Sequence, residues 1–134
     1  MNTTLRLTST LSSGLERLVQ DTIGAFLAVH RELGPGMSEG VYSRACRIEL
    51  DRRGISFEAE KSVPVTYRGR LLCHQRIDLF VDGQLVVEVK SVEQIHPVHV
   101  AQVVSYLRLT RTRIGLVVNF NVPVLKQGIR RVVL

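Results

Sequence analysis

Residues 76–90 read RIDLFVDGQLVVEVK, and this segment decides the fold of the chain. Two apolar runs, each typical of a buried β-strand, flank the turn-forming pair Asp82-Gly83. Side chains two apart in a strand point to the same face, so Glu88 and Lys90 should be neighbours, with Val89 on the other face. An acid and a base that project together from an apolar strand indicate either a structural ion pair at a strand end or a reactive site.

The position of Asp78 relative to Glu88 depends on the turn between the two predicted strands. A two-residue hairpin would place these carboxylates on opposite faces of the sheet. We predict a three-residue loop, 82–84, in which Gly83 takes a left-handed conformation and Asp78 lies opposite Glu88. Two such carboxylates repel each other unless a cation lies between them, and oxygen-only ligation suits Mg²⁺. Lys90 would then orient or deprotonate an attacking water, or stabilise negative charge on a phosphate.

Outward from this segment, the hydrophobic pattern predicts a layered domain. Helices are predicted at residues 12–33, 38–53 and 97–109. Strands are predicted at residues 55–59, 62–67, 71–81, 84–90, 114–120 and 129–134. Two helices that precede a run of strands, with a third helix before the last two strands, predict an α/β (α+β layered) fold. Its centre would be a mixed β-sheet flanked by helices.

The composition fits one globular domain, and its positive charge indicates either an anionic partner or solvated arginines on a soluble surface. The chain has 134 residues, and we expect a flexible tail at 1–14 followed by a single domain at 15–134. No apolar run approaches the roughly 18 residues that span a bilayer, so we expect no membrane partner. The formal net charge is +6, and most of the cations are arginines, whose planar fork matches phosphate oxygens. The two cysteines lack a zinc-type spacing and predict reduced thiols in a cytoplasmic protein.

Several motifs of the chain resemble a known family. Asp78 followed by the segment EVK at 88–90 resembles the signature of the PD-(D/E)xK nuclease superfamily. The segment HRELGPGMSEGVY at 30–42 is similar to the small GxxExxY branch of that superfamily, and QVVSY at 102–106 resembles the Q-x-x-x-Y element of RecB-like nucleases. The resemblance extends over roughly residues 23–134. Ordered elements at consistent spacings are more specific than an isolated D…ExK pattern.

The resemblance implies a restriction-endonuclease-like core and a role for individual side chains. Asp78 and Glu88 would be the principal metal ligands, and Lys90 would be the catalytic lysine. Glu39, on the second predicted helix, would support the metal directly or through water. Gln102 and Tyr106, on the third predicted helix, would face the site and contact the substrate or the groups around it.

Two other side chains are candidates because of their positions alone. Arg76 lies on the same strand face as Asp78, where it would pair with a carboxylate or hold a substrate phosphate. His99 lies near the start of the third predicted helix and would line the cleft. His96 and His99 have a spacing that can hold a transition metal, but no third ligand follows, which disfavours a zinc site.

These features predict a metal-dependent nuclease that hydrolyses phosphodiester bonds in DNA or RNA with Mg²⁺ or Mn²⁺. The alternative is a non-catalytic nucleic-acid- or protein-binding module that retains the nuclease fold. Clustered acids argue against that module, because they repel phosphate unless a metal is present. A hydrolase of a small phosphorylated molecule is a third, less favoured interpretation. A domain this small has a limited footprint on a duplex, which leaves a homodimer or a partner subunit open.

Overall fold

The computed structural model describes residues 11–134, which form three α-helices, five strands and one short 3₁₀ helix. In chain order these elements are α2 (Ser13–Leu33), α3 (Glu39–Arg52), β1 (Phe57–Tyr67), β2 (Arg70–Val81), β3 (Leu85–Lys90), α4 (Pro97–Thr110), β4 (Ile114–Asn119), η1 (Leu125–Gly128) and β5 (Ile129–Val133). The predicted tail falls mostly outside the described residues, and within them α2 begins at Ser13. In this part of the chain no helix is both long and apolar enough to cross a membrane.

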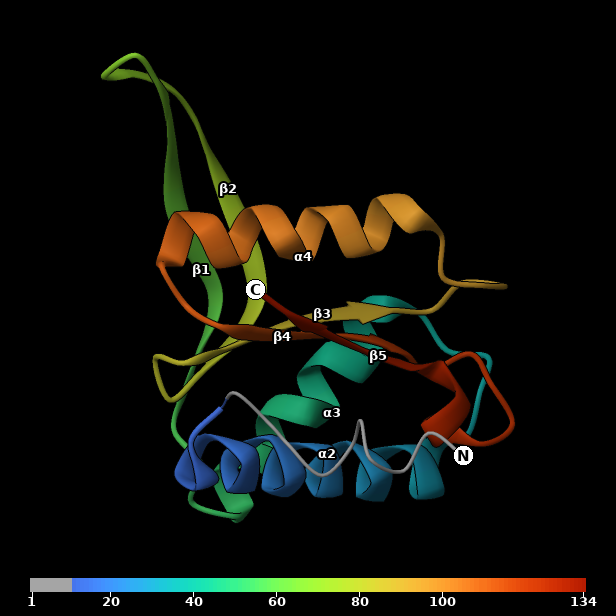
Figure 1. The fold of residues 1–134 in the computed structure, drawn as a ribbon. Coiled ribbons are helices and arrows are strands. Elements are labelled where there is room, and N and C mark those ends of the chain that lie inside the picture. Colours follow the sequence, from blue (N-terminus) through green and yellow to red (C-terminus); the bar gives the residue numbers. More distant parts are fainter. Residues whose placement is uncertain (1–10) are drawn as a thin grey trace, which may run out of the picture.

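The five strands form one mixed sheet in the order β1-β2-β3-β4-β5. Strands β3 and β4 are parallel, and every other neighbouring pair is antiparallel. A parallel pair needs a long crossover, and α4 supplies it across one face, whereas α2 and α3 cover the other face (Figure 1). This arrangement confirms the predicted central mixed sheet flanked by helices. Outside β1, the predicted helices and strands agree with the structure to within one residue at each end.

The core consists of one apolar layer on each face of the sheet. On the α2–α3 side, the rings of Tyr42 and Phe120 stack with their centroids 4.6 Å apart, and Phe26 meets Phe120 edge-on. On the other side, α4 approaches the sheet closely over Gly115. A Cβ atom at that glycine would lie only 2.5 Å from Cγ1 of Val103, so the close approach depends on its absence.

Strand β1 corrects one prediction, because the two strands expected at 55–59 and 62–67 are one continuous strand. Glu60 adopts a left-handed φ of 51°, yet the residues on both sides of it pair with β2 in the same register. The hairpin is nevertheless distorted here. Leu79 packs on the α2–α3 side and Ile77 packs on the α4 side, although regular alternation would place both on one face.

Candidate active site

The turn between β2 and β3 determines which side chains meet. Val81 pairs with Leu85, so the connection is a three-residue loop. Its first two residues have φ values of 51° and 64°, in the left-handed region that Gly83 adopts without strain. The last pair of the ladder away from the turn is Leu79 with Val87. In this register Asp78 and Glu88 are the next two residues to lie opposite each other. The predicted register is therefore confirmed.

Asp78 and Glu88 converge where this ladder ends. The backbone N of Val89 donates a hydrogen bond of 2.8 Å to Oδ2 of Asp78. The backbone N of Asp78 lies 3.4 Å from Oε1 of Glu88, to which it donates a longer bond. Each carboxylate thus accepts from the backbone of the opposite strand, which holds both side chains at the same point of the sheet.

Glu88 occupies an environment that opposes its negative charge. Its side chain is buried, with 3% exposure. Burial, followed by the negative charge of Asp78, raises the pKa of Glu88 to about 8. The nearby charge of Lys90 acts in the opposite direction but does not compensate. At neutral pH and without a cation, the carboxylate pair therefore retains a proton.

Lys90 is the last residue of β3 and is partly buried, two positions beyond Glu88. Its charge acts on His99, whose pKa is lowered first by burial and then by Lys90. Among residues 11–134, all ion pairs involve other cations. The ammonium group of Lys90 is consequently available to a phosphate or to a water molecule.

Helix α4 brings a hydroxyl group to the carboxylate pair. Nε2 of Gln102 donates a 3.0 Å hydrogen bond to the hydroxyl oxygen of Tyr106, which is 3% exposed. Burial and then the negative charge of Glu88 raise the pKa of Tyr106. The structure therefore pairs the two predicted residues of this helix with each other, and their contact with a substrate stays a prediction.

His99 lies at the start of α4. Its Nδ1 accepts a 3.1 Å hydrogen bond from the backbone N of His96, so the ring helps to cap the helix. The positive charge of Lys90 lowers the pKa of His99, and the negative charge of Glu39 acts in the opposite direction. His99 lines a separate pocket with Gln102 and Ser105, and its contribution to the cleft stays a prediction.

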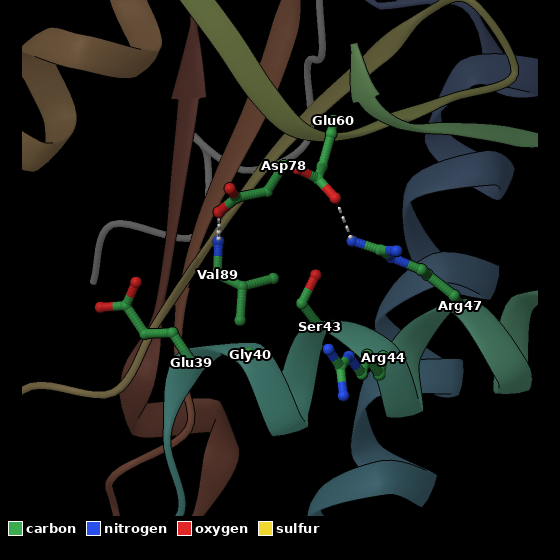
Figure 2. A pocket seen from close by; sticks show the side chains of 8 residues that line it. All are labelled: Glu39, Gly40, Ser43, Arg44, Arg47, Glu60, Asp78 and Val89. Carbon is green, nitrogen blue, oxygen red and sulfur yellow. Dashed lines mark hydrogen bonds and ion pairs between the residues drawn. The ribbon is translucent and has the colours of Figure 1, made fainter.

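A pocket of about 330 Å³ opens beside Asp78 on the α3 side of the sheet (Figure 2). Glu39, the first residue of α3, and Asp78 lie on either side of Val89 in this pocket. Within residues 11–134, no three His, Cys, Asp or Glu side chains are grouped closely enough to hold a metal ion. The two strand carboxylates form a pair, and the role of Glu39 stays a prediction. The pocket is lined by Glu39, Gly40, Ser43, Arg44, Arg47, Glu60, Asp78 and Val89.

Glu60 and Arg47 also line this pocket, and neither was among the site residues predicted from the sequence. Glu60 forms two ion pairs: its Oε1 lies 2.8 Å from Nη1 of Arg76, and its Oε2 lies 3.3 Å from Nη2 of Arg47. The two guanidinium groups lower the pKa of Glu60, Arg47 most strongly. Arg76 thus pairs with a carboxylate, one of the two roles predicted for it. Glu39, Ser43 and Arg47 are spaced four residues apart, and this helical spacing was the available signal for Arg47.

The paired carboxylates and lysine at adjoining strand ends, within a mixed sheet covered by helices, define a restriction-endonuclease-like α/β domain. The family model for the PD-(D/E)XK nuclease superfamily matches residues 16–132. The chain therefore belongs to this superfamily, whose members are usually nucleases and generally use divalent metals. No curated protein and no solved structure gives a significant match. The finer assignment to the GxxExxY branch stays a prediction.

Proposed function

We propose that the protein is a metal-dependent nuclease that hydrolyses phosphodiester bonds in DNA or RNA. The observation that carries this proposal is the convergence of a partly buried Asp78 and a buried Glu88, whose strand also carries Lys90. Two neighbouring carboxylates that cannot both ionise unaided are unfavourable in a metal-free domain. A bound cation would allow both to be charged, so their proximity is understandable as a ligand set.

The chemistry of the donor set fits Mg²⁺ or Mn²⁺. Asp78 and Glu88 supply carboxylate oxygens, and Mg²⁺ commonly binds through one or two carboxylates while it keeps several waters. Glu39 would support the ion from the start of α3, directly or through water. A divalent cation held there would polarise a phosphate and lower the pKa of a bound water.

The surrounding side chains would bind and orient the substrate. Nζ of Lys90 would hold the attacking water or neutralise charge on a phosphate oxygen. The hydroxyl of Tyr106 and the amide of Gln102 would contact the sugar–phosphate backbone, and Arg76 would exchange its carboxylate partner for a phosphate. The lowered pKa of His99 keeps its ring neutral near pH 7, so it would offer a hydrogen bond without competing with the metal as a charge.

The properties of the whole chain support a polyanionic substrate in a reducing compartment. The net charge of +6 favours a nucleic acid over a neutral ligand. Cys46 and Cys73 are free thiols, which is consistent with the cytoplasm. A homodimer would extend the footprint of this small domain on a duplex, and equilibrium sedimentation of the purified protein would measure its mass.

The test of the proposed function is cleavage of end-labelled single- and double-stranded DNA and RNA with Mg²⁺ or Mn²⁺, with EDTA as the blank. Asp78→Ala, Glu88→Ala and Lys90→Ala should each reduce cleavage by at least about 10²-fold while circular dichroism shows a folded protein. Glu32→Ala, at an exposed position near the end of α2, is the matched control and should cleave like the wild type. Folded wild-type protein that cleaves no polymer and binds no Mg²⁺ or Mn²⁺ in calorimetry would favour the binding-module alternative.

A further inference from the structure

The β1–β2 hairpin extends beyond the rest of the sheet and past α4 as a projecting hairpin arm, residues 61–77 (Figure 1). At its tip Tyr67 pairs with Arg70, and Arg68-Gly69 form the two-residue turn between them. Both turn residues have left-handed φ values, 49° and 78°, as tight two-residue hairpins require. The arm is thus a paired, well-defined element that ends in a rigid turn.

The surface of the arm combines exposed apolar groups with positive charge. Tyr67, Leu71 and Leu72 are 62%, 58% and 65% exposed, although large apolar side chains are normally buried in a monomer. The guanidinium of Arg68 stacks over the ring of Tyr67 at 5.6 Å, and Arg70 pairs with no carboxylate of the described chain. Residues 61–77 contain no Asp or Glu and carry four cations, Lys61, Arg68, Arg70 and Arg76.

We propose that the hairpin arm is a second nucleic-acid contact, in which Arg68 and Arg70 hold the sugar–phosphate backbone. Tyr67, Leu71 and Leu72 would pack against bases or sugars. The proposal rests on the proposed nuclease function for the identity of the substrate. Arginine binds phosphate through a planar fork, and aromatic or apolar side chains stack on unpaired bases or wedge between base steps. An arm with cations and no acid fits a polyanion by charge complementarity.

The arm begins at the candidate active site, which explains how one substrate would contact both. Glu60 precedes its first residue, and Asp78 follows its last residue. Eight residues separate Asp78 from Arg70 along β2, roughly 26 Å at about 3.3 Å per residue. This span corresponds to about eight base pairs of B-DNA at about 3.4 Å per step. Between the arm and α4 lies a pocket of about 470 Å³ with Gln102 and Tyr106 in its wall, so a strand from the site to the tip would pass over it.

The test compares two double variants that each remove two positive charges. Arg68→Ala/Arg70→Ala alters the arm, whereas Arg17→Ala/Arg31→Ala alters exposed positions of α2 on the opposite side of the sheet. Fluorescence anisotropy with labelled 20-nucleotide single strands and 20-base-pair duplexes would be measured in EDTA, from about 50 to 200 mM salt.

We expect the arm variant to bind about tenfold or more weakly than the wild type. The slope of log K against log salt should fall in magnitude by about 1.8 for duplex DNA or about 1.4 for single strands, since two phosphate contacts are lost. The α2 control should lose less than about threefold and keep its slope, because only the general charge changes. Equal affinities and slopes for the two double variants would overturn the proposal.

Cleavage kinetics separate failure of the arm from failure of the proposed nuclease function. With Mg²⁺, the arm variant should raise KM and leave kcat unchanged, because Arg68 and Arg70 do not touch the reacting phosphate. If the arm and control variants cleave with the same KM, only the proposed nucleic-acid contact of the arm would be refuted. If the wild type binds nucleic acid but never cleaves it, and the arm variant binds nucleic acid more weakly, only the proposed nuclease function would be refuted. If the arm variant converts a dimer to a monomer without a change in nucleic-acid affinity, the occupant is a second copy and the proposal is wrong.

Discussion

Replacement of Glu88 with glutamine is expected to remove a pH dependence from the stability of the metal-free protein. The pKa of Glu88 rises from 4.5 to about 8 in the folded state, because of burial and then the charge of Asp78. The folded state therefore favours the protonated carboxyl group. Its stabilising contribution is complete below pH 4.5 and is lost as the pH rises through 8. Between pH 6 and pH 8 the unfolded chain is ionised while the folded chain retains most of its proton, so the loss is about 2 kcal/mol.

Thermal unfolding in EDTA at pH 6, 7 and 8 would measure this effect. A loss of about 2 kcal/mol corresponds to a decrease in Tm of roughly 5–10 °C for a domain of this size. Glu88→Gln cannot ionise and should show a flatter profile, whereas Glu32→Gln, at an exposed position, should follow the wild type. Parallel profiles for wild type and Glu88→Gln would refute the electrostatic argument.

Added Mg²⁺ provides a second readout of the same carboxylate pair. Metal binding requires ionised ligands, so it should raise the Tm of the wild type more at pH 8 than at pH 6. The Glu88→Gln variant should lose this difference, because one ligand no longer titrates. An identical Mg²⁺ effect in both proteins would show that the ion binds elsewhere.

Three further predictions concern packing and accessibility. Gly128→Ala should lower the free energy of unfolding by about 2 kcal/mol in urea titrations, because its Cβ would lie 2.1 Å from a backbone carbonyl oxygen. Gly14→Ala, with nothing within 4 Å, should not destabilise. A thiol reagent at pH 8 should label exposed Cys73 quickly and leave Cys46 unmodified in the folded protein, since burial raises the pKa of the Cys46 thiol. Tyr106→Phe should cost about 1 kcal/mol and reduce cleavage more than binding, because the partly buried amide of Gln102 loses the hydroxyl group to which it donates.

The fold was largely predictable because hydrophobic periodicity and turn residues agree along most of the chain. The glycine of the 82–84 loop predicts the register of β2 and β3, and Val81 pairs with Leu85 as that register requires. Sequence pattern could not reveal that β1 is continuous through Glu60. The consecutive charged residues Glu60 and Lys61 interrupt the alternation of apolar and polar residues, whereas pairing with β2 preserves the register around the left-handed Glu60.

The candidate site was predictable where it depends on local spacing and hidden where it depends on long-range packing. Glu88 and Lys90 point to the same face of β3 because side chains alternate along a strand. Gln102 contacts Tyr106 because the two residues are one helical turn apart. The helical spacing of Glu39 and Arg47 predicts that both lie on one face of α3, but the approach of that face to the pocket depends on how α3 crosses the sheet. A bulge near the tip of the hairpin arm also changes the β1–β2 register, so the sequence alone could not place any residue of β1 opposite Asp78.

The distortion at Glu60 connects the candidate active site to the hairpin arm. It moves the following residues of the hairpin to the α4 side, while the Glu60 carboxylate pairs with Arg47 and Arg76. Glu60→Gly would keep the left-handed backbone and remove only the carboxylate, whereas Glu60→Val would oppose that backbone at a cost of about 1–2 kcal/mol. If the bend aligns the arm with the site, Val should weaken both nucleic-acid binding and cleavage relative to Gly. Equal behaviour of the two variants would show that the bend does not matter, and any difference that both then show from the wild type would come from loss of the carboxylate.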